Sequence, residues 1–258
     1  MIKFENCEVL GFDHAIRGMR NPLNSWYKSD SKFCSEFENC EECPMCNPVW
    51  KNFDNTEYET SCKIPYGASF VIGPNDHKLM TDLANAGPSH SKFRRMIVTY
   101  VDITAPLYWW KEFDTYKVGT VANSCSTMHK IADKEFTIDD FSREHLFGIG
   151  DLVELMKESN SAYNIWMSPN GLLTLMVDVL NECRAQYLET KDKKYWWQMI
   201  QLLPSSYNQK RTVILNYEVL SNIYHTRKNH KLDEWHDLCE WIEMLPYSEI
   251  IIGKEKEE

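Results

Sequence analysis

The sequence predicts an α+β fold in which a mostly antiparallel sheet is packed by long helices. Two observations predict it: stretches rich in β-branched and aromatic residues occur before residue 105, and the last third of the chain repeats apolar residues at helical spacing. The 258 residues are 43% hydrophobic, which suffices for one large domain with a substantial core. We expect a single domain over residues 1–258, interrupted by a cysteine-rich insertion at residues 32–63.

The first two thirds of the chain contain elements of both kinds. Loose alternation over residues 1–12 predicts a strand, and MIVTYVDI, with its β-branched and aromatic residues, predicts another. HKLMTDLANAG predicts a helix that ends with Gly87 as its C-cap. The other helices expected in this part lie within residues 13–31, 107–118 and 136–160.

The last third of the chain is expected to be helical. Apolar residues recur at helical spacing in four segments, residues 172–188, 195–203, 211–227 and 232–245. Pro204 separates the second segment from the third, and Ser205, Ser206 or Asn208 is expected to cap the third. The KEKEE tail is expected to be disordered.

Composition and charge restrict the class of partner. The net charge of −10 argues against a nucleic acid polymer or an anionic membrane, although a local basic pocket for a phosphate stays open. No stretch approaches the roughly 18 apolar residues of a membrane helix, and the N-terminus lacks the apolar core of a signal peptide. We therefore expect a cytoplasmic protein whose nine cysteines are reduced.

A group of cysteines in the insertion is a candidate metal site. Cys34, Cys40, Cys43 and Cys46 follow the spacing C-x5-C-x2-C-x2-C. Thiolates separated by two residues can share a tetrahedral Zn²⁺, although this overlap is cramped for one ion. An iron–sulfur cluster and a loop of free thiols are the alternatives.

Two polar loops are candidate binding segments. His90 lies in GPSHSKFRR, just before a predicted strand, and a structural or solvated histidine is the alternative there. A later segment offers Lys117, Thr120, Asn123 and Ser126 over a short stretch, directly after a helix rich in tryptophan. Such a loop can surround an anion or a polar ring, whereas a capped turn is the simpler interpretation.

A third candidate region is the predicted helix 211–227, which carries Asn216, Asn222 and Arg227. Asparagine is a poor helix former, because its side chain competes for backbone hydrogen bonds. Two asparagines in an otherwise apolar helix therefore suggest specific partners. Either the asparagines are core residues whose side chains are hydrogen-bonded within the protein, or they contact a ligand that lies between helices.

The order of these segments resembles the flavin-dependent thymidylate synthases. That family has a loop His before a strand, then A-P-[IL]-[FY], then R-H-R-x-x-S-x-N-x-x-S-x-R-Y, and later L-P followed by two Asn and an Arg. This chain has His90, APLY at 105–108, and Pro204 followed at the family's spacing by Asn216, Asn222 and Arg227. The resemblance covers roughly residues 66–245.

The resemblance implies a reaction and a site. FAD reduced by NADPH would deliver a hydride, and methylenetetrahydrofolate would supply the one-carbon unit to C5 of dUMP, in a homotetramer with active sites between subunits. The implied FAD contacts are His90, Tyr116, Lys117, Thr120, Asn216 and Asn222. The implied substrate contacts are Asn123, Ser126 and Arg227, and Arg227 is also the implied catalytic residue, since a fixed guanidinium can stabilise charge on the pyrimidine.

The chain departs from the family at the phosphate-binding positions. Thr115 and Tyr116 replace the first two residues of R-H-R, and Met128 and Ile200 stand where the family has arginines for the nucleotide phosphate. Either another basic residue replaces them or the substrate is not dUMP; the candidates are Lys130, Lys210 and Arg211.

Three functions are consistent with these features. The first is an FAD-dependent thymidylate synthase-like enzyme. The second is a flavin-dependent enzyme that modifies a different pyrimidine. The third is a non-catalytic scaffold whose insertion binds a metal such as zinc.

Overall fold

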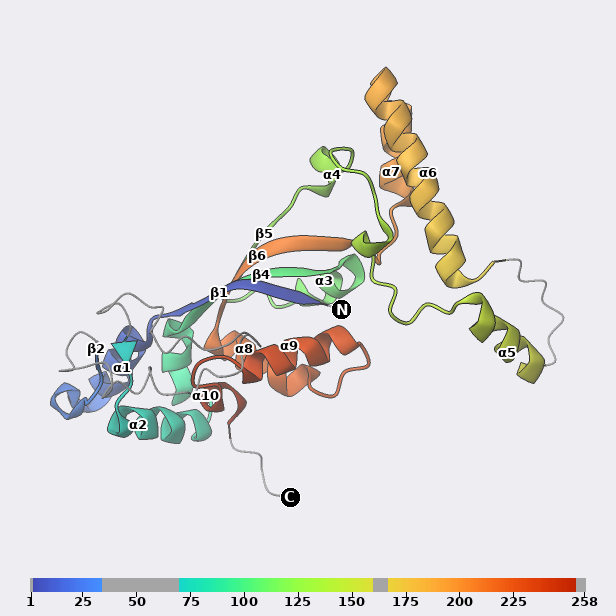
Figure 1. The fold of residues 1–258 in the computed structure, drawn as a ribbon. Coiled ribbons are helices and arrows are strands. Elements are labelled where there is room, and N and C mark those ends of the chain that lie inside the picture. Colours follow the sequence, from blue (N-terminus) through green and yellow to red (C-terminus); the bar gives the residue numbers. More distant parts are fainter. Residues whose placement is uncertain (1, 34–69, 160–166, 254–258) are drawn as a thin grey trace, which may run out of the picture. The chain divides into compact units, whose positions relative to one another are not determined.

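The structure of the protein is a computed structural model that describes residues 2–33, 70–159 and 167–253 (Figure 1). The fold is α+β, as the sequence predicts. The α-helices are α1 (Phe12–Arg20), α2 (Pro74–Asn85), α3 (Leu107–Phe113), α4 (Thr127–Lys130), α5 (Ile149–Ser159), α6 (Pro169–Thr190), α7 (Lys193–Leu202), α8 (Tyr217–Arg227), α9 (Asp233–Glu243) and α10 (Glu249–Ile252). The 3-10 helices are η1 (Asn21–Leu23), η2 (Trp26–Lys28), η7 (Ser91–Met96) and η8 (Ile138–Asp140).

The strands form an antiparallel four-stranded sheet and a small separate pair. The strands are β1 (Lys3–Leu10), β2 (Lys32–Phe33), β3 (Phe70–Val71), β4 (Val98–Pro106), β5 (Thr120–Ser124) and β6 (Asn208–Asn216). The larger sheet has the order β1-β4-β6-β5, and β2 pairs antiparallel with β3.

The chain divides into two compact units. Unit 1 comprises Met1–Lys3, Asp102–Thr115 and Ala122–Thr212, and unit 2 comprises Phe4–Val101, Tyr116–Val121 and Val213–Glu258. The boundaries fall inside β1, β4, β5 and β6, so these strands contribute residues to both units.

Unit 1 contains the hairpin of α6 and α7, which lie side by side (Figure 1). Ser168 and Asp192 cap the two helices with their side chains, accepting hydrogen bonds from the N–H groups of Gly171 and Lys194. These caps satisfy backbone donors that have no partner within a helix. The hairpin contributes to a hydrophobic cluster whose buried members are Ile131, Ala132, Phe136, Phe141, Leu173, Val177, Leu180 and Met199.

The tryptophan-rich helix α3 also lies in unit 1. Trp109, Trp110 and Phe113 are buried and make aromatic contacts with centroid separations of 4.9–5.2 Å. The indole N–H of Trp110 donates to the carbonyl of Gln209 at 2.9 Å, so its polar atom is satisfied. The aromatic end of the segment that carries Lys117 is therefore ordinary core.

Unit 2 is arranged around α8, which is buried along most of its length. Polar side chains on this helix bind its neighbours: the hydroxyls of Tyr217 and Ser221 donate to the carbonyls of Pro246 and Ile251, each at 2.7 Å. The Tyr224 hydroxyl donates to the Glu243 carboxylate at 2.7 Å. Because buried polar groups must be paired, these bonds fix α9 and α10 against α8.

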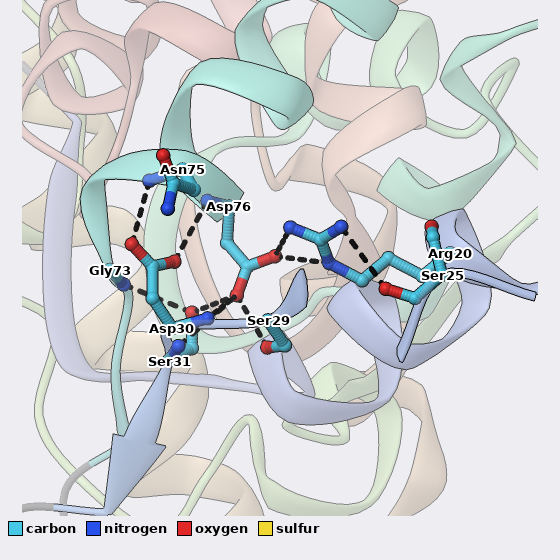
Figure 2. A network of polar contacts seen from close by, with 8 residues as sticks. All are labelled: Arg20, Ser25, Ser29, Asp30, Ser31, Gly73, Asn75 and Asp76. Atoms are coloured by element: carbon cyan, nitrogen blue, oxygen red, sulfur yellow. Dashed lines mark hydrogen bonds and ion pairs between the residues drawn. The ribbon is translucent and has the colours of Figure 1, made fainter. Parts of the chain in front are cut away.

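A buried carboxylate organises the part of unit 2 near the small strand pair (Figure 2). Asp76 is fully buried and accepts hydrogen bonds from the Arg20 guanidinium and the Ser29 and Ser31 hydroxyls, each at 2.6 Å. Burial by itself would raise the pKa of Asp76, but the hydrogen bonds from Ser29, Ser31 and Arg20 outweigh it and lower the pKa.

The neighbouring Asp30 caps α2 from a distant part of the sequence. Its carboxylate accepts the N–H groups of Asn75 at 2.8 Å and Asp76 at 3.1 Å (Figure 2). A carboxylate is favourable at this positive end of a helix. Together, Asp30 and Asp76 tie the residues before β2 to the start of α2.

The sequence predictions for the elements are confirmed in most places. The strands at the N-terminus and at 98–106, and the helices α1, α2, α6, α7 and α9, occur where the sequence predicts them. Gly87 follows the C-cap of α2 with a φ of 101°, in the role expected for it.

Three helix predictions are wrong in part. The expected helix 211–227 is strand β6 up to Asn216 and helix α8 after it, so Ser205, Ser206 and Asn208 cap no helix there. The run TVIL fits either period, and its β-branched residues favour a strand. The helix predicted over 107–118 ends at Phe113, and of the segment 136–160 only α5 is a long helix.

The cysteine-rich insertion, residues 32–63, lies mostly outside the described residues, as do Cys34, Cys40, Cys43 and Cys46 and the KEKEE tail. Only its start, Lys32–Phe33, is described, and there it forms β2. The expectation that residues 1–258 form a single domain stays a prediction.

We predict that Asp76→Asn lowers the free energy of unfolding by about 3–5 kcal/mol, because it leaves the buried Arg20 without its anion. Asp82→Asn, on the exposed side of the same helix, is the matched control and should change little. Urea denaturation of both variants and the wild type measures the difference. Equal stability of the two variants would contradict this account.

The same carboxylate predicts a pH dependence. Since the folded pKa of Asp76 lies below its ordinary value of 3.8, the charged form stabilises the fold. That contribution is complete above the ordinary value and is lost as the pH falls through the folded pKa. Denaturation curves from about pH 3 to pH 7 should therefore show an acid loss of stability that is smaller in Asp76→Asn.

Candidate functional site

Arg227, at the end of α8, is held by aromatic side chains of unit 2. Its Nε donates to the Tyr116 hydroxyl at 2.9 Å, and that hydroxyl lies 3.0 Å from Thr226 Oγ1. The guanidinium carbon lies 4.6 Å from the ring centroid of Trp235 and 5.7 Å from that of Tyr116. The two rings contact each other, with centroids 5.9 Å apart, and the guanidinium lies beside both of them. A planar cation in such contacts, with one N–H already bound, has a restricted orientation.

The loop that follows Tyr116 reaches the other end of α8. Gly119 has a φ of +80°, and a Cβ there would lie 2.7 Å from Asn216 Nδ2 and 3.1 Å from Val219 Cγ2. Both the backbone conformation and the lack of space therefore require glycine. The loop 116–119 thus contacts α8 near its first residues and near its last.

Asn216 is the N-cap of α8. Its Oδ1 accepts the N–H of Val219 at 3.0 Å, while its Nδ2 makes no hydrogen bond to the described residues. The side chain therefore satisfies the helix with one atom and keeps a donor beside Gly119. The adjoining Thr120 hydroxyl is buried and lacks a hydrogen-bond partner among the described residues.

Asn222 lies on another side of α8, and η7, the helix that begins after His90, packs against α8. His90 is exposed and is the N-cap residue of η7, and Arg94 of that helix donates to Ser221 Oγ at 3.3 Å and lies 3.8 Å from Glu218 Oε2. At 100° per residue, Arg227 lies about 20° from Asn216 around α8, whereas Asn222 lies about 120° from it. Asn222 therefore lies on a different face of α8 from Asn216 and Arg227.

Several predicted site residues differ from the expectation in their exposure or in the element that carries them. Asn222 is exposed instead of buried, and Lys117 lies in an exposed loop instead of on a helix. Asn123 and Ser126 belong to unit 1, where Asn123 is exposed and Ser126 caps α4, accepting the N–H of His129 at 3.2 Å.

The basic residues considered for a nucleotide phosphate all have acidic partners. Lys130 lies 2.8 Å from Asp133, Lys210 lies 3.5 Å from Asp102, and Arg211 donates to Asp114 at 2.7 Å. The Arg211 guanidinium carbon also lies 4.2 Å from the Trp110 ring centroid. Each cation is thus already engaged within its own chain.

Met128 and Ile200 stand where the resembling family has arginines for the nucleotide phosphate. Met128 is exposed, and Ile200 packs against the hydrophobic cluster of unit 1. Neither position offers a charge to a phosphate.

Sequence reasoning missed the partners of Arg227 and the role of Gly119. Tyr116 was expected as an FAD contact, but nothing in the sequence linked it to Arg227, 111 positions later. Trp235 looked like part of an amphipathic helix. A glycine between two polar segments was the one available signal for Gly119.

Two absences concern the described part of the chain. Among residues 2–33, 70–159 and 167–253, no three His, Cys, Asp or Glu side chains are grouped to hold a metal ion. None of the helices within these ranges combines the length and the apolar character needed to cross a membrane.

Comparison with known proteins identifies the fold. No protein-family model and no curated protein matches the sequence. Two solved structures of the flavin-dependent thymidylate synthase ThyX from Helicobacter pylori, both with FAD and dUMP, match with a TM-score of 0.57. They are 15% and 16% identical to this chain and cover 98% of it, while the match covers 98% and 97% of their own chains. The chain therefore has a ThyX-like fold over nearly its whole length.

We predict that Gly119→Ala costs about 2–3 kcal/mol of folding free energy and disturbs the cap of α8, since it adds a collision with Asn216 to the strain of a positive φ. Gly87→Ala is the matched control, with a φ of +101° and nothing within 4 Å of the added Cβ. It should show the strain alone, about 1 kcal/mol. Denaturation curves that coincide for the two variants would refute the close approach of the loop to α8.

Proposed function

We propose that this protein is an FAD-dependent thymidylate synthase-like enzyme, which methylates dUMP reductively at C5 with methylenetetrahydrofolate and NADPH. The observation that carries the proposal is the contact between loop 116–119 and α8, in a ThyX-like fold. This contact gathers an oriented arginine, a glycine, and side chains with unused polar atoms.

The residues around the loop fit a flavin. The Thr120 hydroxyl is buried without a partner among the described residues, and Asn216 Nδ2 is unused there. An unpaired buried hydroxyl costs about 1–3 kcal/mol, so a ligand or water that binds it would offset a real penalty. We assign FAD contacts to His90, Tyr116, Lys117, Thr120, Asn216 and Asn222. Bound FAD, reduced by NADPH, supplies the hydride.

Arg227 is the catalytic residue of the proposal. A guanidinium is a planar cation, and the contacts of Arg227 with Tyr116 and Trp235 restrict its orientation. An oriented cation stabilises negative charge that develops on the pyrimidine during attack at C5, without reorganising during the reaction. Asn123 and Ser126 are the other proposed substrate contacts.

A second candidate function is the flavin-dependent modification of a different pyrimidine. It is favoured by the acidic partners of Lys130, Lys210 and Arg211, which leave none of them uncommitted for a phosphate. Two missing charged contacts would weaken binding of a monophosphate by several kcal/mol, at about 1.5–3 kcal/mol each. The non-catalytic scaffold with zinc at Cys34, Cys40, Cys43 and Cys46 is the third candidate.

We further propose a cytoplasmic homotetramer with active sites between subunits. The exposed face of α6 supports this arrangement: Leu172, Leu175 and Val179 lie within about 60° of one another and are 40–53% exposed. Such a row of apolar side chains favours an interface between copies.

The proposed function predicts that the purified protein binds FAD and converts dUMP to dTMP in the presence of NADPH and methylenetetrahydrofolate. Visible absorbance and FAD titration measure the first property, and growth of a thymidine-requiring strain measures the second. FAD binding without growth would favour the second candidate function. A colourless protein that takes up no added FAD would reject both flavoenzymes.

Arg227→Lys should lower kcat/KM by about 100-fold while FAD affinity changes little, because lysine keeps the charge but loses the planar, ring-bound orientation. The neighbouring exposed Lys228→Ala is the control and should retain activity. An unchanged kcat/KM in Arg227→Lys would remove the catalytic role from this residue.

Leu175→Glu combined with Val179→Glu should shift the protein to smaller species in light scattering, since charges cannot be buried in an apolar interface. Ala185→Glu, exposed on the same helix but outside this face, is the control. A tetramer that survives the double substitution would place the interface elsewhere.

A further inference from the structure

The loop that carries Ser126 has no buried side chain to hold it in place. Residues 121–126 are all exposed, and the four residues of α4 that follow include none that is buried. Burial of apolar surface therefore contributes little to the position of this loop, which depends on hydrogen bonds from neighbouring segments. The indole N–H of Trp196 supplies one of them, donating to the carbonyl of Met128 at 3.1 Å.

Gln209, on β6, binds the residues on both sides of Ser126. Its Nε2 donates to the carbonyl of Cys125 at 3.0 Å and to the hydroxyl oxygen of Thr127, also at 3.0 Å. One amide group thus spans Ser126 and fixes the backbone before it and the side chain after it. The N–H of Cys125 donates to the carbonyl of Lys210 at 2.9 Å, which ties the same loop to the next residue of β6.

The orientation of the Gln209 amide is set by Arg211. The Nε of Arg211 donates to Oε1 of Gln209 at 3.0 Å. Because a guanidinium has donors and no acceptor, this contact requires the amide oxygen to face Arg211, and it leaves the amide nitrogen for the loop. Gln209 and Arg211 are two positions apart on a strand, so their side chains lie on the same face of the sheet.

Arg211 is in turn held by the tryptophan-rich helix α3 and the residue after it. Its guanidinium carbon lies 4.2 Å from the ring centroid of Trp110, and its NH1 donates to Asp114 at 2.7 Å. The indole N–H of Trp110 donates to the backbone carbonyl of Gln209 at 2.9 Å. Since Trp110 is fully buried, these contacts lead from the core of unit 1 through Arg211 and Gln209 to the exposed loop.

We propose that Gln209 is a positioning residue for the substrate, because it holds Ser126 where the proposed reaction needs that hydroxyl. The inference rests on the proposed function, in which Ser126 contacts dUMP. Arg211 supports the same arrangement, which gives this arginine a role other than binding a phosphate. A contact residue in an exposed loop needs such support, because the cost of ordering the loop would otherwise reduce substrate affinity.

Gln209→Glu separates this role from a purely structural one. The carboxylate still accepts the N–H of Arg211, but it has no donor for the Cys125 carbonyl and repels it. The KM for dUMP should rise about tenfold while kcat changes little, since a loosened loop loses binding that the ground state and the transition state share. FAD affinity should stay as in the wild type, because every proposed FAD contact belongs to unit 2.

Gln198→Glu is the matched control for this substitution. The Gln198 side chain donates only within its own helix, to the carbonyl of Lys194 at 3.4 Å. The same change of amide to carboxylate there should leave the KM for dUMP as in the wild type.

Hydrogen exchange tests the position of the loop without any ligand. The amides of residues 122–130 should exchange faster in Gln209→Glu than in the wild type, whereas Gln198→Glu should match the wild type. Thr127 gives a second pair of variants. Thr127→Val loses the hydroxyl and should raise both the exchange rate and the KM, while Thr127→Ser keeps the hydroxyl and should preserve both.

The outcomes separate this proposal from its rivals. An unchanged KM or an unchanged exchange rate in Gln209→Glu would each overturn it. So would a joint fall of melting temperature, kcat and FAD affinity, which a purely structural residue predicts. If the wild-type protein does not convert dUMP, the proposed function fails, and the exchange rates then decide alone: faster exchange in Gln209→Glu supports the positioning of Ser126, and equal exchange overturns it.

Discussion

The burial of α8 is the constraint on which the architecture of unit 2 depends. Polar groups on a helix that is buried along most of its length need partners, and Tyr217, Ser221 and Tyr224 have fixed ones on neighbouring segments. The backbone N–H of Tyr217 also donates to the carbonyl of Ile97 at 3.0 Å, which ties the start of the helix to the residue before β4. With the helix fixed in this way, its first and last residues become fixed points against which loop 116–119 can be placed.

Asn216 shows that a structural and a functional interpretation of one residue can both hold. The cap of α8 uses only Oδ1, so the requirement for a capping residue is met without using the amide nitrogen. Ser126 is different, because its hydroxyl both caps α4 and lies beside His129, so a substrate would have to share this hydroxyl with His129. Asn216 and Ser126 thus differ in the number of polar atoms that capping leaves unused, and this number matters more than the residue type.

Periodicity predicted the long amphipathic elements, because α6, α7 and α9 repeat their apolar residues over several turns. It failed at 211–227, where the run TVIL, with three apolar residues, fits a strand as well as a helix. Asn216 marked a boundary there that was interpreted as a helix interior. The order of motifs identified the candidate site, whereas the contacts of Arg227 with Tyr116 and Trp235 could not be predicted. They join positions far apart in the sequence, and no local pattern encodes such a pairing. For the same reason the carboxylate network could not be predicted, since Asp30 caps a helix 45 residues later.

The carboxylate network has a consequence for how this protein could change over evolutionary time. Asp30 and Asp76 anchor the chain just before β2 and just after β3, and the pairing of Phe33 with Phe70 brings the two ends of the intervening stretch together. The entropy of closing a loop grows only slowly with its length, so the stretch between these ends is thermodynamically inexpensive to lengthen, shorten or exchange. The network thus makes this position tolerant of insertions, deletions and exchanges of sequence, while the fold around α8 stays as it is.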